Sequence, residues 1–299
     1  MRNLLFKRLL EEMRKDKRLF FLMGDTGFNL VEPIFEEFPE RSMNVGVAEQ
    51  NMIGIAAGLA NVGYRPVCYA ISNFLVHRCL EQTRNDLCLH NYPAILIGTA
   101  AGLDNGALWA THYIVDDIGC IKPLPGMQVY SPSSVESMHA SFDEVLKSSH
   151  PAYMRIAKSE YSDPSAPKLP NRFVVQEREA KVLVIVHGKM LVNVLEAAKS
   201  VPGKVSVFAM DRIKPLDDKL LKKLLTDHKK IVVVENNFNS GLYNSLCQWV
   251  VEHGIVTQTL VSMAPKEDYG KTTGNAAWLE EQYGITGKDI AKRIRKLAA

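Results

Sequence analysis

Glu49 is the residue whose setting most directly suggests chemistry. It opens a run of small and apolar residues with helical spacing, in which Ile53, Ala56 and Ala57 supply apolar contacts. Apolar surroundings favour the protonated form of a carboxyl group, which can then share its proton with a ligand. The same acid could instead do no more than stabilise the helix dipole from the first turn. Spacing alone leaves both interpretations open.

Two further segments carry side chains suited to a ligand site. Phe74 is followed by His77, which would face the same way on a helix, and by Arg78. His112 follows the loop-like run at 102–106 and has a side chain that titrates near neutral pH. The alternatives are ordinary ones, because buried phenylalanines usually belong to a core and a loop histidine is often only a surface residue.

Alternating helices and strands predict the scaffold that positions these residues. Apolar runs typical of buried strands alternate with helical stretches, which indicates parallel sheets covered by helices. Strands are expected at 19–23, 66–70, 94–98, 127–130, 152–156, 182–186, 205–210, 231–235 and 256–261. Helices are expected around residues 6–13 and at 48–62, 74–89, 135–147, 191–200, 217–227 and 242–253.

A proline-rich stretch predicts a boundary between two domains. Pro164, Pro167 and Pro170 stand among Ser, Asp and Lys, which is typical of an extended connector. The predicted division is a domain over 1–160, a linker over 161–178 and a smaller domain over 179–299. Both domains are expected to be three-layer α/β units, the first with a mainly parallel sheet.

Several segments, in the same order and at compatible spacings, resemble those of transketolases, which use thiamine diphosphate. The run GVAEQNMIGIAAGLA at 46–60 resembles the motif that carries their cofactor-activating glutamate. The other segments are NF at 73–74, R at 78 with EQTRN at 81–85, ATH at 110–112 with DD at 116–117, LPGMQVYSP at 124–132, YMRI at 153–156, RIKPLD at 212–217 and VVVE at 232–235. The chain thus resembles the C-terminal, pyrimidine-binding subunit of a split transketolase.

The resemblance implies a role for three of the candidate side chains. It identifies 1–160 as a thiamine pyrimidine-binding domain and 179–299 as a transketolase C-terminal-like domain. Glu49 matches the glutamate that hydrogen-bonds the aminopyrimidine ring and favours its imino form. Phe74 matches the aromatic residue that stacks on that ring. His112 resembles a substrate-contacting histidine, and we expect it to exchange protons or bond a sugar hydroxyl, so that Glu49 and His112 are the expected catalytic residues.

Five other side chains are assigned to ligands through the same resemblance. Asp25, in the short acidic loop at 24–27, is expected to face the cofactor across a subunit interface. His77 and Arg78 are expected to border the pyrimidine. Arg2 and Arg155 match two anion-binding arginines of the family, and we expect them to bind substrate.

Two departures from the family pattern bear on the substrate. Ala100 stands where related enzymes have a histidine after Gly-Thr, and Leu108 stands where they have an acid four residues before the histidine of the ATH run. Losing both makes the pocket less polar and less cationic. The substrate is therefore expected to differ from the usual sugar phosphates.

The GDG motif and later asparagine that hold the diphosphate and its metal in this family are missing from the sequence. The resemblance thus implies that this chain holds no metal, and that an N-terminal transketolase-like partner subunit holds Mg²⁺ or a similar ion. The expected assembly is an α2β2 heterotetramer that shares thiamine diphosphate and transfers a two-carbon ketol unit between sugar-like substrates. The alternatives are a 2-oxo-acid dehydrogenase beta subunit and a non-catalytic relative.

Composition narrows the remaining classes. The 36 basic and 33 acidic residues leave a formal charge of only +3, without the basic stripe that nucleic-acid binding needs. Five cysteines without a CxxC pair suggest neither a disulfide framework nor a zinc site, which favours a cytoplasmic location. No apolar run approaches the roughly 20 residues of a membrane helix, so no membrane partner is expected.

Overall fold

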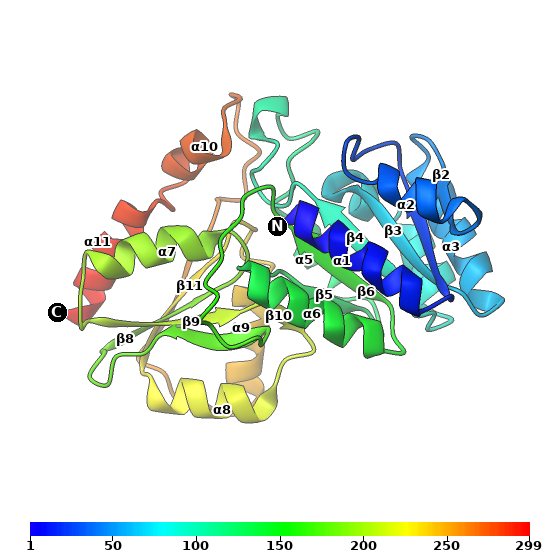
Figure 1. The fold of residues 1–299 in the computed structure, drawn as a ribbon. Helices are drawn as coiled ribbons and strands as arrows, with labels where there is room; N and C mark the ends of the chain where they lie inside the picture. The colour runs from blue at the N-terminus through cyan, green and yellow to red at the C-terminus, as the bar shows by residue number, and fades with distance from the viewer.

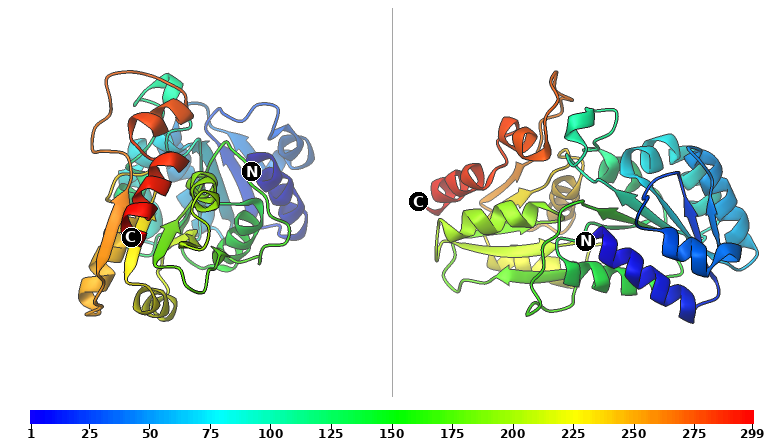
Figure 2. Two further views of the ribbon diagram at one scale, coloured as in Figure 1. Left: turned by 90° about the vertical axis from the view of Figure 1, so that its left-hand side faces the viewer. Right: turned by 45° about the horizontal axis from the view of Figure 1, so that its top comes forward.

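The computed structural model describes residues 1–299, which form two α/β units lying side by side (Figure 1). One sheet has seven strands and the other has five. Helices cover both faces of each sheet (Figure 2). The predicted fold class of two α/β domains is confirmed.

The seven-stranded sheet has the order β10-β5-β6-β4-β3-β1-β2, and only the pair of β10 with β5 is antiparallel. Every residue of β1, β4 and β6 is buried, as expected for parallel strands covered on both faces. The strands are β1 (Leu19–Met23), β2 (Ser42–Asn44), β3 (Arg65–Ile71), β4 (Ile95–Thr99), β5 (Gln128–Tyr130), β6 (Ala152–Ile156) and β10 (Arg212–Lys214).

Two helical layers cover this first sheet. On one face lie α1 (Arg2–Lys15), α2 (Glu32–Glu37) and α6 (Val135–Lys147), which share a core of 22 buried residues with the strands. On the other face lie α3 (Glu49–Asn61), α4 (Leu80–Gln82), α5 (Asp117–Ile121) and the π-helical turns η2 (Phe74–Arg78) and η3 (Thr83–Cys88). Short 3₁₀ turns occur at η1 (Pro39–Arg41) and η4 (Gly106–Leu108).

The five-stranded sheet has the order β12-β11-β8-β9-β7, with β7 antiparallel to β9. Its strands are β7 (Asn171–Val175), β8 (Val182–Val186), β9 (Val205–Met210), β11 (Lys230–Val234) and β12 (Thr259–Met263). Helices α7 (Met190–Lys199) and α11 (Gly287–Ala298) pack on one face, and α8 (Asp218–Asp227) and α9 (Leu242–Glu252) on the other. Helix α10 (Ala276–Gln282) packs against η4.

The two units share their interior. A cluster of 34 buried residues includes Leu22 and Met52 of the first unit together with Phe208 and Trp249 of the second. Strand β10 follows the second unit's β9 in the chain yet pairs with β5 of the first sheet. The units are therefore joined by a common core and a shared sheet edge.

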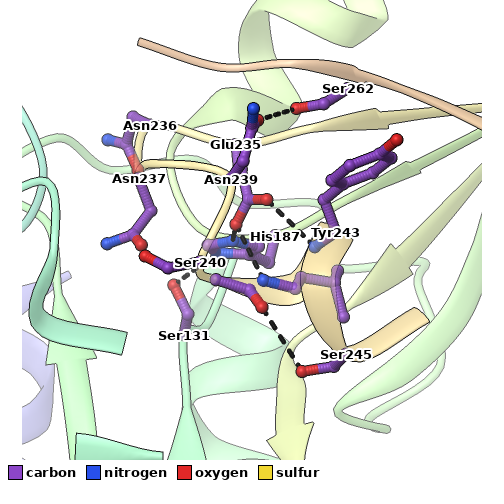
Figure 3. A network of polar contacts seen from close by, with 12 residues as sticks. Ser131, His187, Glu235, Asn236, Asn237, Asn239, Ser240, Tyr243, Ser245 and Ser262 are labelled. Atoms are coloured by element: carbon purple, nitrogen blue, oxygen red, sulfur yellow. Dashed lines mark hydrogen bonds and ion pairs between the residues drawn. The ribbon is translucent and has the colours of Figure 1, made fainter. Parts of the chain in front are cut away.

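A buried polar network also links the units. The His187 ring places Nδ1 2.9 Å from Oγ of Ser131 and Nε2 3.3 Å from Oε2 of Glu235 (Figure 3). Glu235 in turn accepts the backbone N–H groups of Leu242 and Tyr243, the first residues of α9. All the side-chain oxygens of Glu235 thus have partners, which is what a buried carboxylate requires.

Several sequence expectations differ from the structure. The continuous helix expected at 74–89 is interrupted by two π-helical turns, a feature that often marks functional positions. Part of the range expected as linker forms β7, and the strand expected at 256–261 is β12, which begins later. The short strands β2 and β10 and the helices α10 and α11 were not predicted from the sequence pattern. No helix combines the length and apolar character needed to cross a bilayer.

Candidate cofactor and substrate site

Glu49 lies at the carboxyl ends of the first sheet's strands, where α/β proteins usually bind ligands. Its side chain is only 2% exposed, and Oε2 accepts a hydrogen bond of 2.5 Å from Nη1 of Arg78. Gly24, just after β1, packs against it, because a Cβ atom at Gly24 would lie 3.2 Å from Cγ of Glu49. A buried, paired carboxylate therefore faces the strand ends.

Arg78, Phe74 and His112 continue a row of side chains from Glu49. Cζ of Arg78 lies 4.3 Å from the centroid of the Phe74 ring, within cation–π range. The Phe74 and His112 rings meet edge to face, with centroids 5.3 Å apart. Nδ1 of His112 lies 2.9 Å from Oγ1 of Thr111. The structure thus brings together four of the predicted residues.

His77 belongs to a second cluster beside this row. Its Nε2 lies 2.9 Å from Oδ1 of Asp116, whose Oδ2 accepts a 2.8 Å hydrogen bond from the Tyr269 hydroxyl. The hydrogen bond to Asp116, aided by Cys120, raises the pKa of His77 to about 10. His77 is therefore an imidazolium at neutral pH. The sequence provided no sign that Tyr269, from the second unit, would reach this cluster.

The cluster borders a hollow of about 350 Å³. Polar and aromatic side chains dominate its wall, which comprises Asn73, His77, Trp109, Ala110, Thr111, Tyr113, Asp116 and Tyr269. Because Asn73 precedes Phe74 and Thr111 contacts His112, the hollow lies next to the row that begins at Glu49. A small polar ligand in this hollow would be adjacent to His112.

Asp25 and Arg2 lie at the same end of the sheet but outside the row. Asp25 is exposed, has a φ of 46°, and accepts a 2.9 Å hydrogen bond from Nδ2 of Asn44. Arg2 opens α1 close to Tyr69, where burial raises the pKa of the phenol and the charge of Arg2 opposes that rise. Neither side chain contacts Glu49 in this structure.

The substrate role expected for Arg155 is corrected by the structure. The Arg155 side chain is 1% exposed and donates from Nε to Oδ2 of Asp117 at 2.7 Å. Its Nη1 donates to Oδ1 of Asn236 at 2.8 Å, and its Nη2 to the Asn236 carbonyl at 3.1 Å. Arg155 is thus an internal ion-pair partner that joins the two units, and its buried guanidinium is not presented to a substrate.

The two positions that depart from the family pattern differ in exposure. Ala100 is buried and has a φ of 58°, an uncommon conformation for a residue with a Cβ atom. Leu108 is 55% exposed at the end of η4, and its carbonyl accepts the Thr111 hydroxyl at 3.1 Å. Leu108 therefore adds an apolar side chain to the loop that carries His112.

The residues of the row fit the pyrimidine end of thiamine diphosphate. Arg78 occupies Oε2 of Glu49, whereas Oε1 has no hydrogen-bond partner and can bond a ring nitrogen. Phe74 offers an aromatic surface at the same place. No group of three or more His, Cys, Asp or Glu side chains is arranged to hold a metal ion. The fit thus concerns the aminopyrimidine alone.

The fold and this row define the pyrimidine-binding part of a thiamine-diphosphate enzyme. The chain belongs to the transketolase family: residues 1–164 match the pyrimidine-binding domain of transketolase, and residues 172–290 match the transketolase C-terminal domain. The resemblance drawn from the sequence motifs is confirmed. The family match favours transketolase over a 2-oxo-acid dehydrogenase beta subunit.

Similar proteins include components of split enzymes. One of the two chains of the apulose-4-phosphate transketolase of Actinobacillus succinogenes is 29% identical over 260 residues, covering 84% of each chain. The 6-deoxy-6-sulfo-D-fructose transketolase subunit SqwH of Clostridium sp. strain MSTE9 is 26% identical over 298 residues, covering 97% of this chain and 91% of its own. A solved structure, described as a split-gene transketolase in an inactive beta4 tetramer, has a TM-score of 0.87 and 26% identity, covering 99% of this chain and 97% of its own.

Proposed function

We propose that this chain is the pyrimidine-binding subunit of a transketolase, and that it transfers a two-carbon ketol unit only when a partner subunit completes the site. The observation that carries the proposal is the row of Glu49, Arg78, Phe74 and His112 at the strand ends. The partner would supply the diphosphate and Mg²⁺ site, because this chain has no cluster of metal-binding side chains. An α2β2 assembly and a cytoplasmic setting, which suits five free thiols, belong to the proposal.

Each residue of the row has a distinct task in this proposal. When bound, thiamine diphosphate supplies the electron sink for the carbon–carbon chemistry. Glu49 holds or shares a proton with the aminopyrimidine through Oε1, while Arg78 fixes the carboxylate through Oε2. Phe74 covers one face of the ring and excludes water from it. His112 bonds or exchanges a proton with a substrate hydroxyl.

His77 and two peripheral residues complete the proposed ligand contacts. His77, charged at neutral pH, borders the cofactor on the side of the hollow. Asp25 faces the cofactor bound at the neighbouring subunit, in keeping with its exposed position. Arg2 binds an anionic group of the substrate at the strand ends.

An atypical ketose with an anionic group is the proposed substrate. Buried Ala100 and exposed Leu108 leave the pocket less polar than the family pattern. Two similar proteins are named for apulose 4-phosphate and 6-deoxy-6-sulfo-D-fructose, which are both unusual sugars with a negative charge. These features support a substrate outside xylulose 5-phosphate and fructose 6-phosphate.

The first test asks whether this chain needs a partner. Calorimetry of the isolated chain with thiamine diphosphate and Mg²⁺ should show weak binding, and binding should tighten in the complex with a transketolase N-terminal subunit. The reconstituted complex should transfer ketol units from a panel of ketoses. Tight, Mg²⁺-dependent binding by the isolated chain would refute the half-site proposal.

The second test concerns Glu49. Glu49→Gln should leave folding and assembly intact but lower turnover of the complex about 100-fold or more, since an amide cannot share the proton. Exchange of the thiazolium C–H in heavy water should slow as well. The matched control is Glu40→Gln, the same change at an exposed residue without a hydrogen-bond partner, which should be neutral. Unchanged exchange in Glu49→Gln would remove this residue from the mechanism.

A further inference from the structure

A loop of the second unit reaches the hollow beside His112. Nε1 of Trp109 donates to the Gly270 carbonyl at 3.2 Å, and the Tyr113 hydroxyl donates to the Tyr269 carbonyl at 2.6 Å. From behind, the Tyr283 hydroxyl donates to the Asp268 carbonyl at 2.8 Å. Three consecutive residues of this loop are thus fixed by side-chain hydrogen bonds, two of them from the loop that carries His112.

Tyr269 is held at both ends and still faces the hollow. Its carbonyl is bonded by Tyr113, and its hydroxyl donates to Oδ2 of Asp116 at 2.8 Å. The residue nevertheless remains 52% exposed and lines the hollow. A large aromatic side chain that is fixed and exposed at once is prepared to contact a ligand, because little side-chain entropy is lost on binding.

The charges in the hollow balance, which constrains what it can bind. Asp116 pairs with His77 through Oδ1 and with Tyr269 through Oδ2, so neither charged group is left alone. Asn73 donates to the Thr111 carbonyl at 2.6 Å, which leaves its amide oxygen available. Neutral donors and acceptors beside an aromatic surface suit hydroxyl groups better than a phosphate or sulfonate.

We propose that Tyr269 is a specificity-determining residue, which contacts the hydroxyl-bearing part of the ketose next to the atoms that His112 contacts. This inference rests on the proposed function and deepens it, because it gives the C-terminal domain a part in substrate choice. The Tyr269 hydroxyl, fixed by Asp116, reads the position of a substrate hydroxyl, and the ring packs against the carbon chain. An anionic end of the substrate lies outside this hollow.

The experiment uses the reconstituted complex with Tyr269→Phe. Initial rates are measured on ketose pairs that differ in the configuration of one hydroxyl, such as D-xylulose with D-ribulose and D-fructose with D-tagatose. Loss of one hydrogen bond should raise KM for the preferred member roughly three- to tenfold and reduce discrimination by a similar factor. The kcat value and the affinity for thiamine diphosphate should stay within about twofold, because the row at Glu49 is unchanged.

A control and a second variant separate specificity from loop support. Tyr283→Phe removes a hydroxyl that supports the same loop but does not line the hollow, and it should leave the ratios of kcat/KM unchanged. Tyr269→Leu removes the aromatic face as well and should reduce discrimination further. A Tyr269→Phe complex with wild-type ratios, or one that loses assembly or cofactor affinity instead, overturns this inference. A wild-type complex that transfers no ketol unit overturns the proposed function itself.

Discussion

Replacing Arg155 by methionine removes the charge that balances a buried carboxylate. Asp117 is fully buried and accepts hydrogen bonds from Arg155 Nε at 2.7 Å, the Tyr153 hydroxyl at 2.8 Å and Asn237 Nδ2 at 2.7 Å. Without Arg155 the carboxylate keeps two neutral donors but has no countercharge, and Asn236 loses its bonds from the guanidinium. Breaking a buried pair in this way lowers the free energy of unfolding by about 3–5 kcal/mol.

Urea unfolding of the chain, followed by far-UV circular dichroism and by fluorescence, measures this loss. The matched control is Arg14→Met, because Arg14 forms its 2.7 Å ion pair with Glu37 at the surface and is 53% exposed. That change should cost about 1 kcal/mol or less. The double variant Arg155→Met with Asp117→Leu should be more stable than Arg155→Met alone, since it no longer buries an unpaired charge.

Two results would refute this interpretation of Arg155. The first is a loss in Arg155→Met no larger than in the surface control. The second is a variant of wild-type stability whose complex shows only a raised KM, as a substrate-binding arginine would. The expected result is a less stable chain, in which the first and second units lose their common ion pair.

Two further predictions follow from the geometry. Asp116→Asn should lower the pKa of His77 from about 10 towards its ordinary value, as measured by NMR titration of the ring, and the stability gap to the wild type should be fully present below about pH 6.5 and close as pH rises through about 10; an unchanged pKa would exclude Asp116 as its cause. Gly98→Ala should lower the free energy of unfolding by about 1–3 kcal/mol, because the new Cβ would lie 2.6 Å from Oγ of Ser72 and 2.7 Å from the Tyr153 ring. Its control, Gly54→Ala, meets nothing within 4 Å on α3 and should be neutral or stabilising; equal effects of the two changes would contradict the packing argument.

The sequence predicted most of the buried strands and the row at Glu49. Strands such as β1 and β8 are continuous apolar runs, because both faces of a parallel strand are covered. Glu49, Phe74 and His112 could be found because each lies in a short motif of distinctive residue types. These local signals survive folding, since neighbouring residues keep their spacing on one helix or loop.

The rest depended on contacts between distant parts of the chain. Tyr269 and Asp116 are 153 residues apart, and no local pattern indicates that their side chains meet. Arg155 was wrongly expected at a substrate because residue type alone cannot show that Asp117 neutralises it inside the protein. The π-helical turns escaped detection because their apolar spacing over a few residues resembles that of an α-helix.

Strand β10 has a consequence for how the chain is made. During translation, residues 1–160 leave the ribosome before residues 212–214, so the first sheet initially lacks its outermost strand. Until then the backbone N–H and C=O groups of β5 on that side are an open edge, which can pair with another nascent chain. A fragment that ends at residue 160 would keep this edge permanently. The N-terminal unit should therefore aggregate when it is expressed alone, and a fragment designed for studying it must retain residues 212–214 or cover β5 by other means.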